Sequence, residues 1–156
     1  MLIGVISDTH GLLRPEALEA LRGVDQILHA GDVGDPAILD ALRTIAPITA
    51  IRGNIDVTGA CAHLAATELV ELGGQSIYML HDLSRLDLDP KASGISVVIS
   101  GHSHQSRIDR HKSVLYFNPG SAGPRRFSLP VSLGLLEITA SAITPSLVNL
   151  SIASLD

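Results

Sequence analysis

The sequence predicts an α/β fold, and two features of the chain carry this prediction. In the first third, short β-branched runs alternate with helix-like segments, which is typical of parallel strands joined by right-handed helical crossovers. Beyond it, strand-like runs follow one another with turn residues between them, which indicates a second sheet. Because 156 residues suffice for one core but hardly for two, we expect a single domain over residues 1–156.

The first third is expected to contain a strand, a helix, a strand, a helix and a strand, over Leu2–Ser7, Pro15–Leu21, Gln26–Ala30, Pro36–Ile45 and Ile48–Arg52. Each expected helix begins with a proline, which suits the first helical turn because that position needs no backbone N–H donor. Gly23 suits the C-terminal cap of the first helix. The order of these elements predicts a parallel sheet.

The rest of the chain is expected to contain six strands: Thr67–Leu72, Ser76–Leu80, Ile95–Ser100, Val114–Asn118, Val131–Ile138 and Ile143–Ile152. Gly73-Gly74 is a two-residue hairpin signal between the first two of them. The last two are expected to form a closing hairpin around Ser141. We interpret residues 87–94 as a loop or a short helical insert, and Asp109-Arg110-His111-Lys112 as a charged turn.

The composition is that of a soluble protein with an aliphatic core, because 46% of the residues are hydrophobic but only 3% are aromatic. The net charge of −5 leaves no broad basic face and argues against binding of long nucleic acids. Cys61 is the only cysteine, which excludes a disulfide framework and fits a reducing, cytoplasmic setting. The uncharged stretch 138–155 carries too many Ser and Thr residues for a bilayer helix, so we expect no membrane association.

Residue types that bind metals follow five of the expected strands, at the point where each strand ends. The motifs, in chain order, are Ser7-Asp8-Thr9-His10, Gly31-Asp32, Gly53-Asn54, His81 and Gly101-His102-Ser103-His104. In open α/β sheets the carboxyl ends of parallel strands converge on the ligand crevice. Two carboxylates, one amide and four imidazoles are therefore expected at one edge, and this set can supply two divalent ions with oxygen and nitrogen ligands.

Each motif by itself has an ordinary structural interpretation. An Asp after a strand is more often a turn residue or a helix cap than a ligand, Gly53-Asn54 is a common turn dipeptide, and a lone His81 is more often a packed imidazole. Gly-His-x-His is rarer, because the 14 Gly and 7 His of this chain give roughly 0.03 such motifs by chance. The order of all five motifs predicts the metal site.

This ordered set resembles that of the calcineurin-like metallophosphoesterases. Three segments are similar to the small single-domain phosphodiesterases called YfcE-like: Ile3-Gly4-Val5-Ile6-Ser7-Asp8-Thr9-His10, Leu28-His29-Ala30-Gly31-Asp32 and Asn118-Pro119-Gly120-Ser121. The match runs from Met1 to about Arg126. The resemblance implies a four-layer α/β/β/α sandwich with two mixed sheets in the middle.

The resemblance also implies the roles of the site residues. One ion would be held by Asp8, His10, Asp32 and His104. The other would be held by Asp32, Asn54, His81 and His102, with Asp32 as the bridge. Asp32, Asn54 and His81 are the expected catalytic residues. Mn²⁺ is the implied ion, and the mixed ligands also suit Zn²⁺, Fe or Ni²⁺. Two such ions can activate a shared water as a hydroxide that attacks phosphorus in line.

The sequence departs from the family pattern at two places. Many relatives carry Asn-His-Asp, whose His can protonate the leaving group, where this chain has Asn54-Ile55-Asp56. The usual His-Gly-His is replaced by His81-Asp82-Leu83. A missing general acid lowers the rate by about 10²–10⁴, so we expect slow hydrolysis that favours good leaving groups. The charge of Asp82 is expected to disfavour dianionic monoesters more than monoanionic diesters.

We therefore expect a metal-dependent phosphodiesterase acting on small phosphate diesters. One alternative is a weak or inactive member of the fold that serves as a protein-binding scaffold, as the retromer subunit does after losing metal ligands. All seven ligand positions are filled here, and only Asp82 hints at the scaffold. A second alternative is a metal-dependent nuclease, against which the acidic charge argues. Relatives are often homodimers, although no repeated apolar stripe in this chain predicts one.

Three further features have two interpretations each. His29 is either a buried structural imidazole or a residue that orients a metal ligand. Asn118-Pro119-Gly120-Ser121 either lies near the site or is simply a tight turn. Arg125 and Arg126 either hold substrate phosphate or form a solvated face, and we favour the solvated face.

Overall fold

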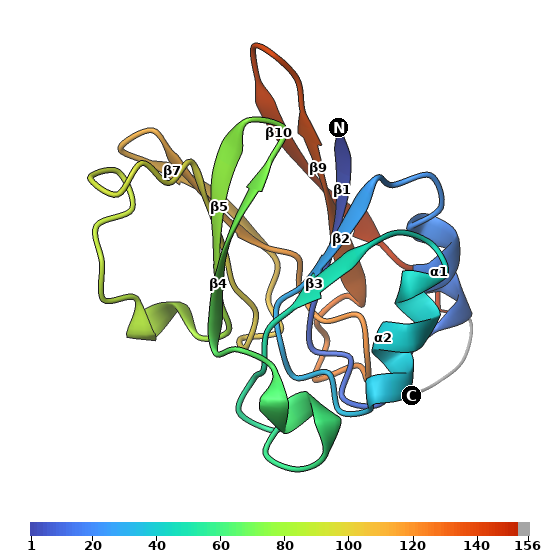
Figure 1. The fold of residues 1–156 in the computed structure, drawn as a ribbon. Helices are drawn as coiled ribbons and strands as arrows, with labels where there is room; N and C mark the ends of the chain where they lie inside the picture. The colour runs from blue at the N-terminus through green and yellow to red at the C-terminus, as the bar shows by residue number, and fades with distance from the viewer. Residues whose placement is uncertain (153–156) are drawn as a thin grey trace.

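The computed structural model describes residues 1–152, which form two five-stranded sheets (Figure 1). The first sheet has the order β10-β9-β1-β2-β3 and comprises β1 (Leu2–Ile6), β2 (Gln26–His29), β3 (Ile48–Ala50), β9 (Ser132–Ile138) and β10 (Ile143–Asn149). Strands β1, β2 and β3 are parallel, whereas β9 runs antiparallel to both β1 and β10. The β9–β10 pair is the closing hairpin that the sequence predicts.

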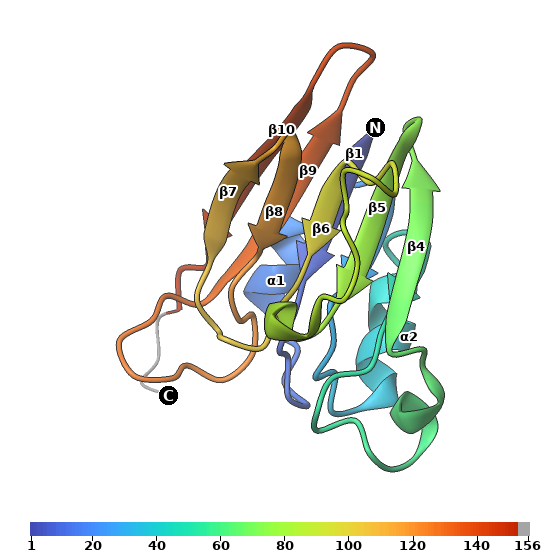
Figure 2. The same ribbon diagram turned by 90° about the vertical axis from the view of Figure 1, so that its left-hand side faces the viewer.

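The second sheet has the order β4-β5-β6-β8-β7 and faces the viewer in Figure 2. Its strands are β4 (Thr67–Leu72), β5 (Gln75–Leu80), β6 (Val97–Ile99), β7 (Arg107–His111) and β8 (Val114–Asn118). Strands β5, β6 and β8 are parallel, and the edge strands β4 and β7 are antiparallel to their neighbours. Both sheets are therefore mixed, as predicted.

Helices α1 (Pro15–Ala20) and α2 (Pro36–Arg43) lie together on one face of the first sheet (Figure 1). Both start with the proline on which their prediction depended, and the side chain of Asp35 caps α2 by accepting a hydrogen bond from the backbone N–H of Ala37 at 2.9 Å. Within residues 1–152, no helix is long and apolar enough to cross a membrane.

The core between the sheets is aliphatic because alternate residues of each strand point toward the other sheet. Val5 and Leu28 from the first sheet pack with Met79, Ile99 and Phe117 from the second, all at 1% exposure or less. A second apolar cluster fills the space between the first sheet and the helices. This packing holds the strand ends of both sheets in fixed positions at one edge of the sandwich.

The predicted fold class is confirmed, and the predicted strand ends differ from the observed ones by at most three residues. The outer layer on the second sheet differs from the α-helical layer that the resemblance implies. Among the described residues it consists of the 3₁₀ turn η2 (Leu83–Arg85) and the loop that follows, which pack Leu83, Leu86 and Leu88 onto the sheet. The loop interpretation of residues 87–94 is thereby confirmed.

The charged turn predicted at Asp109–Lys112 is wrong. Residues Arg107–His111 form β7, which pairs with β8 along its whole length. Every residue of β7 is exposed, so the apolar alternation that marks a half-buried strand is missing from its sequence. The turn itself comes later, at Lys112 and Ser113, which both have positive φ as a two-residue hairpin requires.

Candidate metal centre

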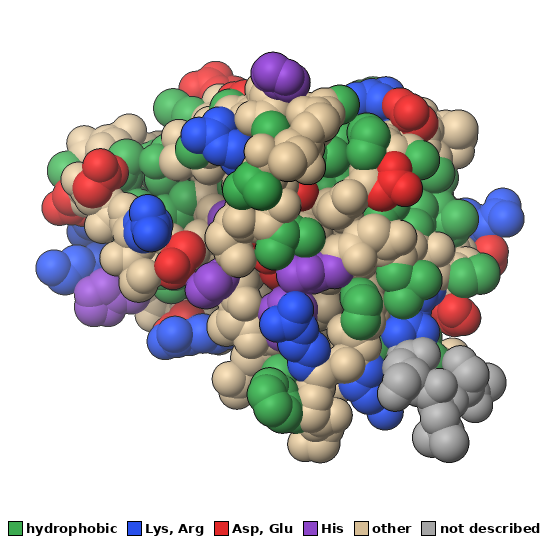
Figure 3. Space-filling model, turned by 90° about the horizontal axis from the view of Figure 1, so that it is seen from below, with side chains coloured by type: hydrophobic (Ala, Val, Ile, Leu, Met, Phe, Trp, Pro, Cys, Tyr) green, Lys and Arg blue, Asp and Glu red, His purple; other side chains and the backbone are tan. Residues whose placement is uncertain are grey.

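The seven predicted ligand residues lie at one edge of the sandwich, where strands of both sheets end. Asp8, His10, Asp32, Asn54, His81, His102 and His104 each approach at least one other member of the set within 4 Å. Figure 3 views this edge of the molecule and shows histidine side chains beside a basic side chain near the middle of the face. The convergence of strand ends that the sequence predicts is therefore found in the structure.

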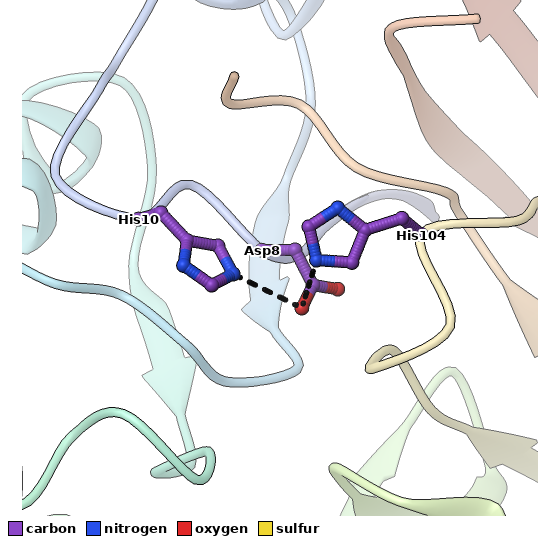
Figure 4. A group of neighbouring side chains, drawn as sticks. All are labelled: Asp8, His10 and His104. Carbon is purple, nitrogen blue, oxygen red and sulfur yellow. Dashed lines mark ion pairs between the residues drawn. The ribbon is translucent and has the colours of Figure 1, made fainter. Parts of the chain in front are cut away.

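Asp8 occupies the centre of the cluster and is fully buried. Its Oδ1 atom lies 3.4 Å from Nε2 of His104, 3.7 Å from Nε2 of His81 and 3.8 Å from Nε2 of His10. Figure 4 shows the rings of His10 and His104 both directed at this oxygen, His10 from the left of the view and His104 from the upper right. The other oxygen, Oδ2, accepts hydrogen bonds from Ser7 Oγ and from the backbone N–H of His102.

Asp32 lies between two of the imidazoles. Its Oδ2 atom is 3.3 Å from Nε2 of His10 and 3.2 Å from Nε2 of His81. Its Oδ1 atom accepts a hydrogen bond from the backbone N–H of Ile55 at 3.0 Å. One oxygen is thus held by a backbone hydrogen bond, and the other faces the imidazoles of His10 and His81.

Asn54 and His102 form the outer corner of the cluster. Nδ1 of His102 lies 3.1 Å from Oδ1 of Asn54, and the rings of His81 and His102 meet edge to face at 5.3 Å. The side chain of His102 is 45% exposed, in contrast to 5% for that of His104. The two histidines of the Gly-His-x-His motif therefore lie in different surroundings, one at the surface and one buried.

The backbone at the site is strained. Five of the seven residues adopt positive φ: Asp8, His10, Asp32, His102 and His104. This region is sparsely populated by residues other than Gly, and such strain gathers at functional sites. In the Gly-His-x-His loop it produces the turn that brings both imidazoles to one edge, which an extended strand would not do.

Two glycines let the loops approach the carboxylates closely. A Cβ at Gly53 would collide with the carboxylate and the backbone nitrogen of Asp32. A Cβ at Gly101 would collide with Oγ of Ser7 and lie 2.6 Å from Oδ2 of Asp8. The glycines that precede Asn54 and His102 are therefore required by the packing of the site itself.

The polar atoms of the site fit a divalent cation. Oδ1 of Asp8, Nε2 of His10, Nε2 of His81 and Nδ1 of His104 are buried without a hydrogen-bond partner. Buried polar groups in proteins are nearly always paired. Asp8 belongs to two candidate metal groups, one with His10 and His104 and the other with Asp32 and His81. Carboxylate oxygens and imidazole nitrogens are ligands for Mn²⁺, Zn²⁺ and Fe.

The electrostatics of the cluster keep both carboxylates ionised. Burial alone would raise the pKa of Asp8, but the nearby imidazoles of His10 and His81 outweigh it and lower the pKa below 3.8. The pKa of Asp32 is also lowered, because His81 and the N–H of Ile55 outweigh its burial. Two buried negative charges side by side favour occupation by cations.

Asp56 is a supporting residue that the sequence analysis missed. It is 3% exposed, and its carboxylate accepts hydrogen bonds from three backbone N–H groups, those of Val33, Gly34 and Gly53. It therefore ties the loop after β2, which carries Asp32, to the loop after β3, which carries Asn54. The Asn-x-Asp spacing of the resemblance was the available signal for it.

His29 is a buried structural imidazole, which is the first of its two interpretations. It also contacts the loops that carry the site. Its Nδ1 accepts a hydrogen bond from the N–H of Gly31, and its Nε2 lies 3.0 Å from Oγ of Thr9, which itself donates to the carbonyl oxygen of Val33. Nε2 therefore carries the proton. Complete burial, opposed in part by Asp8 and Asp56, lowers the pKa of His29 to about 4, so the ring is neutral.

Asn118 lies near the site and also forms a turn. Its side-chain oxygen accepts a hydrogen bond from the N–H of Gly120, and its Nδ2 donates to the carbonyl oxygen of Gly101 at 2.9 Å. It thus supports the loop that carries His102 and His104. Arg125 and Arg126 are both exposed. Burial lowers the pKa of His104, Asp8 opposes this and Arg126 reinforces it, which places the charge of Arg126 near the cluster.

Two mixed sheets with carboxylates and imidazoles converging at the strand ends form an α/β sandwich with a candidate metal site. Residues 1–141 match the calcineurin-like phosphoesterase superfamily domain, and the chain belongs to this superfamily. A probable metallophosphoesterase of Methanocaldococcus jannaschii is 40% identical over 134 residues, which cover 78% of this chain and 68% of the relative. The resemblance deduced from the motifs is confirmed.

Two solved structures share the fold across nearly the whole chain. A novel archaeal phosphodiesterase superposes with a TM-score of 0.78 at 24% identity, covering 95% of this chain and all of the other. Vps29 from Chaetomium thermophilum superposes with a TM-score of 0.77 at 20% identity, covering 97% of each chain. At these identities the two structures establish the architecture of the sandwich.

Proposed function

We propose that this phosphoesterase is a metal-dependent phosphodiesterase that hydrolyses small phosphate diesters. The observation that carries the proposal is that Oδ1 of Asp8, Nε2 of His10 and Nε2 of His81 are buried without a hydrogen-bond partner, with Nε2 of His104 only 3.4 Å from the same Asp8 oxygen. Cations would satisfy these atoms together, and the superfamily supports phosphate-ester hydrolysis. The acidic chain, at −5, favours a small substrate over a nucleic-acid polymer.

We assign the ligands as the resemblance implies: Asp8, His10, Asp32 and His104 for one ion, and Asp32, Asn54, His81 and His102 for the other. Oδ2 of Asp32 lies within 3.3 Å of Nε2 of His10, from the first ligand set, and of Nε2 of His81, from the second. This position supports the role of Asp32 as the bridge. When bound, two divalent ions lower the pKa of a shared water and offset charge on the phosphate. The resemblance favours Mn²⁺, and the ligand types also suit Zn²⁺, Fe or Ni²⁺.

The remaining residues select the substrate by charge. Asp82 lies 3.8 Å from Nε2 of His102, and two hydrogen bonds from Ser84 keep its pKa below 3.8. It is therefore a fixed negative charge beside the site, which disfavours a dianionic monoester. Arg126 is an exposed cation whose charge acts on His104, and it is able to hold a phosphate oxygen. The side chain of Ile55 has no proton to give a leaving group.

The test strips the protein with a chelator, restores Mn²⁺, and times hydrolysis of bis(p-nitrophenyl) phosphate beside p-nitrophenyl phosphate. We expect metal-dependent cleavage of the diester that Asp32→Asn abolishes, with the monoester cleaved more slowly. Circular dichroism of Asp32→Asn provides the folding control. Faster cleavage of the monoester, or cleavage that survives chelation, would contradict the proposal.

The scaffold is the second candidate function, and Asp82 next to His102 is the observation that favours it. Absence of hydrolysis with Mn²⁺, Zn²⁺, Fe²⁺ and Ni²⁺ in a folded protein that still binds these ions would support the scaffold over the enzyme. The cytoplasmic setting rests on the lone Cys61, and the homodimer rests on the resemblance alone. Size-exclusion chromatography with light scattering tests the dimer.

A further inference from the structure

The chain has only two tyrosines and no tryptophan, and both tyrosines lie on the outer face of the second sheet. The strand register places them in one row: Tyr78 on β5 is opposite Val98 on β6, which is opposite Tyr116 on β8. Two strand spacings separate the tyrosines, about 10 Å. Both are half-buried and pack against the apolar cluster on that face.

A strap formed by residues 82–88 runs over the outer face of the second sheet (Figure 2), with Leu83 lining the same hollow as Tyr116, and Arg85 and Asp87 the same hollow as Tyr78. It contains the turn η2, and its Leu83, Leu86 and Leu88 side chains pack onto the cluster that includes Val98. The strap leaves one hollow on each side. The hollow of about 740 Å³ contains Tyr78, and the hollow of about 490 Å³ contains Tyr116.

Both hollows reach the candidate metal centre. His102 and Asp82 line both of them and thus form the partition at the point where the two meet. The larger hollow is also lined by Asn54 and His81, and the smaller by Gly101 and Ser103. A phosphorus atom held at the metal ligands would therefore have a hollow on either side of it.

Neither hollow carries a surplus of positive charge. Arg52 and Arg85 line the larger hollow together with Asp82 and Asp87, and Arg107 lines the smaller one together with Asp82. Arg107 is moreover paired with Asp109 at 2.7 Å. A hollow without surplus positive charge and with a tyrosine ring in its wall suits a neutral, flat group that contacts the aromatic face. Both volumes lie in the range of small-molecule sites.

We propose that the two hollows bind the two ester groups of one phosphate diester, and that each receives a neutral aromatic or nucleoside-like group against its tyrosine. This inference rests on the proposed phosphodiesterase function and narrows its substrate class. It predicts that diesters with two flat groups bind more tightly than diesters with one, and that dialkyl diesters with small groups bind weakly.

The two tyrosines allow a binding experiment that reads each hollow separately. Protein labelled with 3-fluorotyrosine gives two ¹⁹F resonances, which Tyr78→Phe and Tyr116→Phe assign. The Zn²⁺-loaded protein is titrated with diphenyl phosphate, methyl phenyl phosphate and dimethyl phosphate. Phenol is a poor leaving group, with a pKa of about 10 as for the tyrosine side chain, and ³¹P spectra of the same samples record any hydrolysis.

We expect diphenyl phosphate to shift both resonances with one common Kd. Methyl phenyl phosphate should shift only the Tyr78 resonance, because the larger hollow is continuous with more of the ligand residues, and dimethyl phosphate should shift neither. Ala66→Trp fills the larger hollow and Ser106→Trp the smaller, so each should suppress the shift of its own tyrosine and spare the other. Both positions line the hollows without belonging to the ligand set.

The outcomes separate this inference from the proposed function. If diphenyl phosphate binds and neither resonance moves, or if dimethyl phosphate binds as tightly, the two-hollow assignment is wrong even when bis(p-nitrophenyl) phosphate is hydrolysed. If both resonances move but no diester is hydrolysed with any ion, the hollows bind the diester and the phosphodiesterase proposal fails.

Discussion

Nδ1 of His81 lies 2.7 Å from the carbonyl oxygen of Ala30. A carbonyl only accepts, so Nδ1 carries the hydrogen and Nε2 is the atom directed at Asp8 and Asp32. Without a metal, a proton on Nε2 best satisfies these carboxylates. Burial alone would lower the pKa of His81, but the nearby carboxylates of Asp32 and Asp8 outweigh it and raise the pKa above 6.5. The same nitrogen, Nε2 of His81, is therefore placed to bind either a metal ion or a proton.

Metal binding is accordingly expected to release a proton from His81. Below its raised pKa the imidazole is protonated, so Mn²⁺ affinity should rise with pH from 6 to 8 as the proton becomes easier to displace. Titration of the metal-free protein with Mn²⁺ in weakly buffered solution measures the protons released. His81→Asn, which has no proton to lose, should release fewer at pH 6.5. Equal release from both proteins would show that His81 is neutral before the metal binds.

Asp56 is expected to control metal affinity without touching the metal. Asp56→Ala leaves the N–H groups of Val33, Gly34 and Gly53 without their acceptor, each loss being worth about 1–3 kcal/mol when the group stays buried. We expect a large loss of stability and a drop in Mn²⁺ affinity of about 10–100-fold, typical of residues that orient ligands.

Asp56→Asn is the matched variant for this prediction, because it keeps one acceptor oxygen. It should retain most of the stability and show a smaller loss of affinity. Thermal unfolding with and without Mn²⁺ measures both quantities. An Asp56→Ala protein with unchanged affinity would show that the two loops hold their positions independently.

The neutral state of His29 is expected to make the metal-free protein sensitive to acid. The unfolded chain takes up this proton near pH 6.5 and the folded protein only near pH 4, so the unfolded state holds more protons between these values. The free energy of unfolding should therefore fall as pH drops from 6.5 to 4, by about 3 kcal/mol from this residue, and this contribution is fully present above pH 6.5. Urea unfolding at several pH values, in a chelator, measures it.

His29→Asn is the control for the acid sensitivity. Its side-chain oxygen can replace Nδ1 as the acceptor for the N–H of Gly31, but it does not titrate. The variant should be less stable at pH 7 and should lose less stability than the parent between pH 6.5 and pH 4. An identical slope in both proteins would assign the acid sensitivity to other groups.

The sequence predicted the parts of the fold and site that depend on local pattern. Asp8 and Asp32 follow buried apolar strands, and the ends of parallel strands meet, so their proximity could be deduced without coordinates. The roles of Asp56 and Asn118 could not be deduced from local pattern, because both act through hydrogen bonds that include backbone groups 17 to 23 residues away, those of Val33, Gly34 and Gly101. The side-chain pattern of a sequence does not indicate which distant backbone groups a side chain will bind. Strand β7 was missed because an exposed edge strand has no buried face.

The charge of Asp82 is expected to set the preference for diesters over monoesters. Asp82→Asn removes a negative charge 3.8 Å from His102, and should raise kcat/KM for p-nitrophenyl phosphate by about tenfold relative to that for the diester. Asp87→Asn is the matched control, since it removes the same charge from the rim of the larger hollow. If the ratio changes equally in both variants, the preference depends on the total negative charge of this face and not on Asp82 in particular.

Ile55 is expected to limit the rate with poor leaving groups. It follows Asn54 directly, is 40% exposed, and donates its backbone N–H to Asp32, so a side chain at this position stands beside the site. Ile55→His supplies an imidazole near neutral pKa, and a general acid contributes about 10²–10⁴ in rate when well positioned. We expect an acceleration of at least about tenfold for phenyl esters and little for p-nitrophenyl esters, whose leaving group needs no proton.

The measurement for Ile55→His is the dependence of kcat/KM on leaving-group pKa across a series of aryl methyl phosphates. The parent should show a steep dependence and Ile55→His a shallower one. Val57→His is the control, because Val57 lies on the same loop and is 72% exposed, but two residues further from Asn54. If both variants flatten the dependence equally, an imidazole can protonate the leaving group from either position, and position 55 has no special role. If neither does, the leaving group departs on the side of the site away from Ile55.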